Sequence, residues 1–379
     1  LAPKDVTPAQ LKAVFDNMKD ESGKHLFTIG VNDDVTHLSL DVHEPLITES
    51  ADTVSCKFWG LGSDGTVGAN KNSAKIIGDY AGMYTQAYFE YDSKKSYGIT
   101  KSHLRFSKSP IRSTYLIKDF LACHSQSYIT RYDMIHEIKD GGTFLLNTSW
   151  TEEELAEKLP GDVKQYIARH NVQFYIVDAN RLARELGLGN HANMILQAAF
   201  FKLSGVMPVE DAVRHMKEAV QKTYAKKGEK VVNMNMAAVD AGINSPVKVN
   251  VPADWANAAD DRTVDESLPD VVKNIVVPCN RQRGDDLPVS AFLPYQDGTY
   301  PLGTSKYDKR GIAAFLPQWD SNKCLQCNQC TFVCPHAAIR AYLVDEEEAA
   351  AAPAAFTTVP AKGAKGLQYR LQVSTLDCT

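Results

Sequence analysis

Four closely spaced cysteines near the carboxyl end of the chain have the residue type and the spacing to bind iron. They are Cys324, Cys327, Cys330 and Cys334, and Pro335 follows the last of them. The pattern C-x₂-C-x₂-C-x₃-C-P is typical of proteins that hold two 4Fe–4S clusters, in which three thiolates ligate one cluster and the fourth ligates the other. The predicted chemistry is therefore the storage and transfer of single electrons.

Two other uses of clustered cysteines fit this pattern less well. Zinc sites usually combine two C-x₂-C pairs across a long gap, which this tight run lacks. Disulfide sets are typical of small secreted domains, whereas this chain has 379 residues and its other cysteines are scattered. Binding of iron–sulfur clusters is the favoured interpretation.

A second stretch, residues 54–81, has the pattern of a phosphate-binding turn. Val54–Trp59 is mostly apolar and predicts a strand, residues 60–65 have the pattern G-x-G-x-x-G, and apolar side chains at helical spacing follow. Glycines permit positive φ and close approach of a phosphate, and the amino end of the helix presents free N–H groups to it. Because a strand precedes the turn and a helix follows it, the pattern is more specific than isolated glycines.

A segment rich in basic residues follows the next predicted strand, Thr85–Tyr91. It contains no Asp or Glu and includes Lys94, Lys95, Lys101, Arg105, Lys108, Arg112 and Lys118. Beside a glycine turn, such a basic loop favours a ligand with several phosphates, and coenzyme A fits better than NAD. Two alternatives stay open: a solvated basic surface strip, and a nicotinamide site in which Glu90 or Asp92 binds a ribose hydroxyl.

Two other groups of reactive residue types are interpreted as structural. Cys123 and His124 are adjacent, so on a strand they point to opposite faces and cannot form a thiol–imidazole pair. His25, His37 and His43 have no regular spacing, and we expect no metal site there.

Strands that alternate with helices must position the glycine turn. Further strands are predicted at 25–30, 37–40, 113–121, 143–147 and 173–177, and helices at 8–18, from the capping box at Thr151, after Asp178, and at 192–203 and 209–226. This alternation predicts an α/β fold with a mostly parallel sheet and helices on both faces. Phosphate ligands of such sheets bind at the carboxyl ends of the strands, where the glycine turn lies.

The remaining segments have less regular patterns. Residues 238–270 are predicted to be a linker that wraps over the surface, and residues 284–318 a small module too poor in apolar residues for its own core. After a strand that ends at Val344, residues 345–365 are expected to be a mobile or loosely draped insertion, and Gly366–Thr375 a further strand.

Composition indicates a soluble globular protein, because 44% of the residues are hydrophobic and 23% are charged. The formal net charge of −5 argues against general nucleic-acid binding. No apolar run has membrane-spanning length, and we identify no signal peptide. Scattered free cysteines are typical of a reducing compartment, so a cytoplasmic location is expected.

Two sets of motifs resemble one known family. Residues 58–71, Phe-Trp-Gly-Leu-Gly-Ser-Asp-Gly-Thr-Val-Gly-Ala-Asn-Lys, look like part of the gamma domain of 2-oxoacid:ferredoxin oxidoreductases. Five further motifs resemble the linker of the single-chain pyruvate:ferredoxin (flavodoxin) oxidoreductases: Pro288–Phe292, Asp297–Thr299, Gly303-Thr304, Lys309-Arg310 and Gln318-Trp319. The resemblance extends from about Phe27 to Cys378, and many members have Glu where this chain has Asp308.

The resemblance implies a homodimeric enzyme that converts pyruvate and coenzyme A to acetyl-CoA and CO₂. Thiamine diphosphate and Mg²⁺ would support the decarboxylation, and 4Fe–4S clusters would pass electrons to ferredoxin or flavodoxin. This chain lacks a Gly-Asp-Gly followed by paired Asn, so we expect the thiamine site in the remaining domains of the same enzyme. The chain is then a central portion: the end of an α/β domain (1–51), a gamma domain (52–245), an extended linker (246–318) and a partial 2×4Fe–4S ferredoxin-like domain (319–379).

Site roles follow from the same resemblance, and they include no catalytic residue in this chain. Contacts with coenzyme A are expected from Gly62, Asp64, Gly65, Thr66, Lys94 and Lys95. One cluster is expected on Cys324, Cys327 and Cys330, and another on Cys334 together with Cys378. The alternatives are a non-catalytic iron–sulfur electron-transfer module with a phosphate-ligand-binding domain, and a NAD-dependent dehydrogenase.

Overall fold

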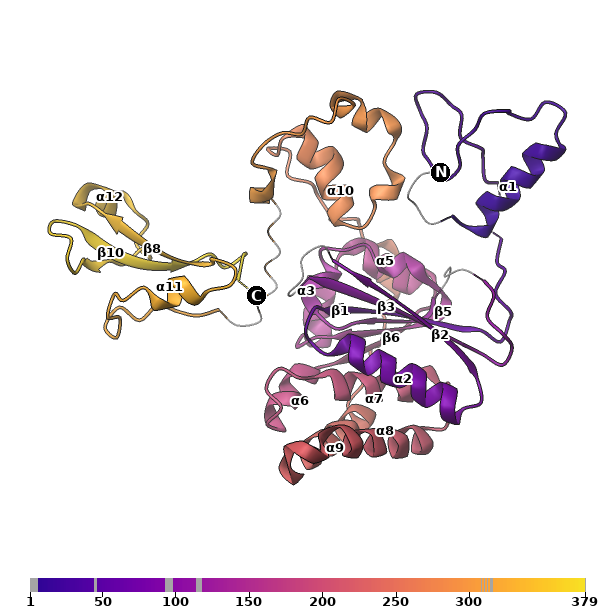
Figure 1. Ribbon diagram of the computed structural model, residues 1–379, viewed down its shortest axis with the longest axis horizontal. Coiled ribbons are helices and arrows are strands. Elements are labelled where there is room, and N and C mark those ends of the chain that lie inside the picture. Colours follow the sequence, from indigo (N-terminus) through magenta and orange to yellow (C-terminus); the bar gives the residue numbers. More distant parts are fainter. Residues whose placement is uncertain are drawn as a thin grey trace. The chain divides into compact units, whose positions relative to one another are not determined.

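The computed structural model describes residues 6–43, 46–92, 98–113, 118–307, 309, 311, 313 and 316–378. The chain divides into two compact units, one that ends at Tyr300 and one that begins at Pro301 (Figure 1). The domain boundaries expected at residues 52, 246 and 319 remain predictions. None of the helices within the described ranges is long and apolar enough to cross a membrane.

A seven-stranded sheet forms the centre of the first unit. Its strands are β1 (Val54–Leu61), β2 (Tyr84–Tyr91), β3 (Ile99–Ser107), β4 (Lys118–Cys123), β5 (Ile138–Asn147), β6 (Gln173–Val177) and β7 (Val247–Lys248). Their order in the sheet is β2-β3-β1-β4-β5-β6-β7. The central strands β1, β4, β5 and β6 pair in parallel, whereas β2, β3 and β7 add antiparallel edges. The α/β class and the parallel centre of the sheet are confirmed.

Helices cover both faces of this sheet, as expected. They are α2 (Thr66–Tyr80), α3 (Gln126–Ile129), α4 (Glu152–Lys158), α5 (Gly161–Arg169), α6 (Ala179–Glu185), α7 (Asn193–Ser204), α8 (Val209–Tyr224) and α9 (Glu229–Asn244), and α1 (Pro8–Lys19) and α10 (Val277–Asn280) lie outside the layers. Figure 1 shows α2, α6, α7, α8 and α9 on one face and α3 and α5 on the other. Phe200 of α7 packs on Phe58 of β1 and Phe120 of β4, with ring centroids 5.1 and 5.2 Å apart. This aromatic contact holds the two strands whose carboxyl ends carry the glycine turn and the residues that follow β4.

Three expectations about the first unit are wrong. The basic segment is not all loop, because residues 99–107 form β3, which is antiparallel to both β1 and β2. Residues 238–244, which the sequence pattern predicts to be the start of the linker, form the carboxyl-terminal part of α9. Near the amino end, the two expected strands reduce to a single bridge between Thr28 and Ser39.

The segment after α9 is tied to the sheet by specific contacts. Trp255 is buried in a 3₁₀ turn that packs against α5. Arg262 Nε donates a hydrogen bond to Asp162 Oδ1 at 2.8 Å. Further along, Val289 N–H donates to the Asn32 carbonyl at 2.9 Å. The linker and the start of the small module therefore lie against other parts of the first unit, as their low apolar content predicts.

The second unit consists of a three-stranded sheet and two short helices. It contains α11 (Gln329–Val333), β8 (Ile339–Val344), α12 (Glu346–Ala351), β9 (Val359–Pro360) and β10 (Gln368–Val373). β10 lies between β8 and β9 and is antiparallel to both. The expectation of a loosely draped insertion at 345–365 is wrong, because this segment forms α12 and β9. Its helix starts with a capping box in which Glu348 N–H donates to Asp345 Oδ1 at 2.8 Å.

Candidate functional site

The glycine turn after β1 is held rigid by one carboxylate. Asp64 Oδ1 accepts from Thr66 N–H at 2.7 Å, and Asp64 Oδ2 accepts from Leu61 N–H at 2.9 Å and from the Thr66 hydroxyl at 2.8 Å. Gly65 has φ +92°, a left-handed conformation that L side chains rarely adopt, and it directly precedes the first residue of α2. The carboxylate therefore fixes the turn and satisfies an N–H at the start of α2.

A cavity of about 640 Å³ opens beside this turn. Its lining residues come from the turn and from the facing ends of β2 and β3: Leu61, Gly62, Ser63, Asp64, Gly65, Val67, Tyr91, Asp92, Gly98, Ile99 and Thr100. The volume is in the range of small-molecule sites. Of the predicted contact residues, Gly62, Asp64 and Gly65 line this cavity, whereas Thr66 is buried behind them. Lys94 and Lys95 lie outside the described residues.

His124 is a partly buried residue at this site that sequence reasoning did not select. Its Nδ1 lies 2.8 Å from Thr66 Oγ1, and its backbone N–H donates to the Trp59 carbonyl at 2.9 Å. Because the Thr66 hydroxyl gives its proton to Asp64, we infer that His124 Nδ1–H is the donor to that hydroxyl. Burial lowers the pKa of His124 and outweighs the opposite effect of Asp64, so the imidazole is neutral at pH 7.

The position of His124 in the chain could have predicted its place at the site. It directly follows β4, which is parallel to β1, so the carboxyl ends of both strands meet at one edge of the sheet. Its neighbour Cys123 has a different partner, since Cys123 Sγ donates to the Ser125 carbonyl at 3.1 Å. Burial raises the pKa of the Cys123 thiol to about 12, which agrees with the interpretation of this cysteine as structural.

Part of the basic segment is committed to the sheet and is not available to a phosphate. Arg105 is buried and donates to Glu49 Oε1 at 3.1 Å and to the Ser113 carbonyl at 2.7 Å. Lys101 pairs with Glu90 Oε2 at 2.5 Å. The interpretation of the whole segment as a phosphate-binding basic loop is therefore wrong for the residues on β3.

The cysteine run of the second unit folds as a loop with several left-handed residues. Gln326, Asn328 and Ala337 have φ values of +58°, +59° and +48°. Two backbone amides point at sulfur: Gln326 N–H donates to Cys324 Sγ at 3.4 Å, and Ala338 N–H donates to Cys334 Sγ at 3.3 Å. Cysteine sulfurs that ligate clusters commonly accept hydrogen bonds from backbone N–H groups. The cysteines of this loop therefore fit a 4Fe–4S cluster.

The electrostatics at Cys334 agree with this fit. Burial raises the pKa of its thiol, but backbone N–H donors from residues 336–339 outweigh burial and lower it. A lowered pKa favours the thiolate, which is the form that binds metal.

The predicted second pair of ligands, Cys334 and Cys378, lies on neighbouring stretches of chain. Ser374 N–H donates to the Ala338 carbonyl at 2.7 Å, and Cys378 N–H donates to the Ser374 carbonyl at 3.1 Å. Lys309 Nζ also contacts the Asp377 carboxylate at 2.7 Å. These contacts hold the segment that carries Cys378 beside the chain that follows Cys334; the assignment of these two cysteines to one cluster remains a prediction.

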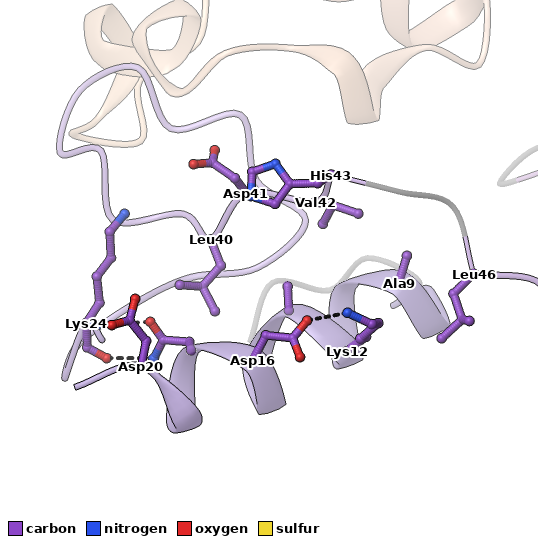
Figure 2. Close-up of a pocket in the computed structure, with 12 residues that line it drawn as sticks. Ala9, Lys12, Asp16, Asp20, Lys24, Leu40, Asp41, Val42, His43 and Leu46 are labelled. Atoms are coloured by element: carbon purple, nitrogen blue, oxygen red, sulfur yellow. Dashed lines mark hydrogen bonds and ion pairs between the residues drawn. The ribbon is translucent and has the colours of Figure 1, made fainter. Parts of the chain in front are cut away.

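A second cavity, of about 380 Å³, lies between α1 and a set of residues that includes 40–43 and Leu46 (Figure 2). Figure 2 shows His43 and Asp41 on one side and Lys12 and Asp16 of α1 on the other. Lys12 Nζ and Asp16 Oδ2 form an ion pair at 2.5 Å, so these charges already have partners. No residue of the glycine turn lines this cavity, and His43 is the one histidine among its described lining residues.

Within the described ranges, one group of side chains has metal-binding spacing: Asp133, His136 and Asp162. Arg283 Nη1 lies 2.9 Å from Asp133 Oδ2, and Arg262 Nε lies 2.8 Å from Asp162 Oδ1. Since both carboxylates pair with arginine, we interpret the group as an ion-pair network that fastens the linker. His25, His37 and His43 do not belong to this group.

Together these features define a class of protein. The first unit is an α/β domain with a glycine turn and a cavity at the carboxyl edge of its parallel strands, and the second unit has the cysteine pattern of an iron–sulfur electron carrier.

Comparison with known families then names the family. The profile of the pyruvate ferredoxin/flavodoxin oxidoreductase family matches residues 55–245, which is half of the chain. A domain of unknown function matches residues 258–313, and a 4Fe-4S binding domain matches residues 316–339. The chain belongs to the pyruvate ferredoxin/flavodoxin oxidoreductase family.

Curated relatives agree along the full chain. It is 52% identical over 385 residues to a pyruvate:ferredoxin oxidoreductase of Moorella thermoacetica and 53% identical over 382 residues to a pyruvate-flavodoxin oxidoreductase of Enterobacter agglomerans. Each match covers 100% of this chain and 33% of the relative, so the chain spans about a third of the relatives' length. Among solved structures, a pyruvate oxidoreductase subunit of Thermotoga maritima aligns with a TM-score of 0.43 and 16% identity, over 52% of this chain and 99% of that subunit.

Proposed function

We propose that this chain is the coenzyme A-contacting and electron-receiving portion of a pyruvate:ferredoxin (flavodoxin) oxidoreductase. The whole enzyme converts pyruvate and coenzyme A to acetyl-CoA and CO₂ and passes two electrons, one at a time, to ferredoxin or flavodoxin. The observation that carries the proposal is the identity of 52–53% along the whole chain to two enzymes of that name. The cysteine pattern and the glycine-turn cavity supply the two functions that such a portion needs.

In the first unit, the glycine turn positions the phosphates of coenzyme A. The N–H groups at the start of α2 face the pyrophosphate, and Gly62 and Gly65 leave room for it because they have no Cβ. Lys94 and Lys95 neutralise phosphate charge as ammonium groups. The Thr66 hydroxyl holds the Asp64 carboxylate that fixes the turn, and His124 in turn holds the Thr66 hydroxyl.

In the second unit, the cysteine thiolates hold 4Fe–4S clusters, which supply one-electron redox chemistry when they are bound. Cys324, Cys327 and Cys330 ligate one cluster, and Cys334 and Cys378 contribute to another. Thiamine diphosphate and Mg²⁺ bind to the remaining domains of a cytoplasmic homodimer. The protein positions the clusters and sets their reduction potentials.

The experiment that tests the proposal is an assay of the full-length polypeptide under anaerobic conditions. Pyruvate and coenzyme A together should reduce methyl viologen, and omission of pyruvate should abolish the reduction. A full-length protein with bound clusters that reduces no dye would contradict the proposal and favour a non-catalytic electron carrier. Titration with coenzyme A and with NADH separates the dehydrogenase alternative, for which only NADH should bind.

A further inference from the structure

The inserted segment of the second unit, residues 345–367, is held against β10 by the side chain of Arg370. It leaves β8 after Val344 and rejoins the sheet at Gln368, and these two residues pair with each other. The Arg370 guanidinium lies 4.7 Å from the ring of Phe356 within the segment. Arg370 Nη1 also donates to the Thr357 carbonyl at 2.8 Å. The segment therefore has one defined position over β10.

The part of the segment that pairs with β10 contacts the cluster-binding loop, residues 324–334, through the side chain of Gln326. Gln326 lies between the first two cysteines of the run, and its carboxamide makes two hydrogen bonds to the backbone of the segment. Gln326 Nε2 donates to the Pro360 carbonyl at 2.9 Å, and Lys362 N–H donates to Gln326 Oε1 at 2.7 Å. Both polar atoms of the side chain are therefore used by residues 34 and 36 positions further along the chain.

The same loop has a second anchor on β10. Tyr369 is buried, and its hydroxyl donates to Asn328 Oδ1 at 2.7 Å. Gln326 and Asn328 are both left-handed, at φ +58° and +59°, a conformation that is unfavourable for a residue with a Cβ. The two anchors offset that cost, and they hold the Gln326 N–H where it donates to Cys324 Sγ at 3.4 Å.

We propose that the segment 345–367 positions the cluster held by Cys324, Cys327 and Cys330, and that it acts through Gln326. Reduction of a cluster adds negative charge, and an N–H dipole aimed at a ligand sulfur stabilises that charge. By fixing the left-handed turn at Gln326, the segment fixes this dipole and raises the reduction potential of the cluster. Gln326 is a positioning residue, and the inference rests on the proposed binding of a cluster to these cysteines.

The test is a redox titration of the full-length protein followed by electron paramagnetic resonance. Gln326→Ala and Gln326→Met remove both hydrogen bonds, and Met keeps the length of the side chain. Each should shift the midpoint potential of one cluster to a more negative value, with the iron content and the other clusters unchanged. Lys362→Ala is the matched control, because Lys362 contributes its backbone N–H and not its side chain, and it should leave every potential unchanged.

A second variant tests whether the segment acts through Gln326. Replacement of residues 345–367 by Asn-Gly joins the paired residues Val344 and Gln368 by a short hairpin turn. This variant should show the same negative shift, and Gln326→Ala added to it should cause no further shift. Unshifted potentials in Gln326→Met with full iron content would overturn the inference, as would fully additive shifts. Absence of iron from the wild-type protein would instead contradict cluster binding itself.

Discussion

At the scale of single residues, the negative charge of Asp64 lies beside the proposed phosphate site and is compensated by hydrogen bonds. A carboxylate beside a phosphate site would repel the ligand, yet Asp64 accepts three hydrogen bonds from Leu61 and Thr66. These donors spread the negative charge over the turn. We therefore expect Asp64 to contact coenzyme A through its backbone and to shape the turn with its side chain.

Cys327 is the most direct test of the cluster assignment. Cys327→Ser should remove one cluster and slow electron exit, because a serine hydroxyl at neutral pH is a poor replacement for a thiolate. Iron analysis and visible absorption measure the loss. Cys279→Ser is the control, since Cys279 is exposed and lies outside the cysteine run. Unchanged iron content in Cys327→Ser would refute the ligand assignment.

Lys95 tests the coenzyme A assignment. Lys95→Ala should raise the KM for coenzyme A about tenfold, because a hydrogen bond to a charged group contributes roughly 1.5 kcal/mol. Decarboxylation of pyruvate without coenzyme A should stay nearly unchanged. Lys75→Ala, at an exposed position of α2, is the control. An equal loss in both assays for Lys95→Ala would mean that this lysine is structural.

At the scale of elements, the junction of β1 and α2 depends on two different glycines. Gly65 has φ +92°, and a Cβ there would lie 3.1 Å from the Asn193 side chain. Gly68 is within α2, and nothing lies within 4 Å of a Cβ placed there. Substitution by alanine should therefore destabilise the protein at Gly65 but not at Gly68.

Gly65→Ala should destabilise the first unit by about 1–2 kcal/mol, since it forces a side chain into a left-handed conformation. It should also raise the KM for coenzyme A. Gly68→Ala should be neutral or stabilise by about 0.5–1 kcal/mol, because alanine favours a helix over glycine. Denaturant unfolding followed by tryptophan fluorescence measures both effects. Equal destabilisation by the two variants would contradict this account of the turn.

The lowered pKa of Lys118 on β4 should make the stability of the first unit depend on pH. Burial lowers its pKa to about 8, and Glu137 opposes that shift only in part. Between pH 8 and the ordinary lysine pKa near 10.5, the unfolded chain binds more protons than the folded one, so stability should rise with pH. From pH 8 to 9.5 the gain should be on the order of 2 kcal/mol.

The measurement is the denaturation midpoint of the wild type and of Lys118→Met at pH 7.5 and 9.5. The variant cannot change charge at residue 118, so its rise across this interval should be smaller than that of the wild type. An identical rise in both proteins would show that Lys118 has the same pKa in the folded and unfolded states.

At the scale of the whole molecule, the two proposed functions lie in different compact units. The glycine turn and its cavity belong to the unit that ends at Tyr300, and all five predicted cluster ligands belong to the unit that begins at Pro301. Loss of one function should therefore leave the other intact.

Removal of iron from the full-length protein tests this separation. After oxidation and chelation, reduction of methyl viologen should disappear, because no cluster remains to accept electrons. Coenzyme A should still bind, with an affinity within about twofold of the untreated protein, as measured by calorimetry. A parallel loss of coenzyme A binding would show that the clusters support the first unit structurally.

Short-range pattern was enough to predict the α/β class, the junction of β1 and α2 and the cysteine run, because periodicity, turn residues and ligand spacing are local properties of a chain. It failed for β3, because Arg105 and Lys101 are residue types typical of a solvated loop. In the folded chain Arg105 is buried beside Glu49, and the partly buried Lys101 pairs with Glu90. It also failed for the insertion, whose alanines and lysines carry no local signal of the contacts that Arg370 makes.

Tertiary structure alone decided which residues meet. His124 reaches Thr66 because β1 and β4 are parallel neighbours, and Gln326 reaches Lys362 because β8 and β10 return the chain to the cluster-binding loop. Such contacts join positions tens of residues apart, and their free energy comes from packing and burial that no local window of sequence contains.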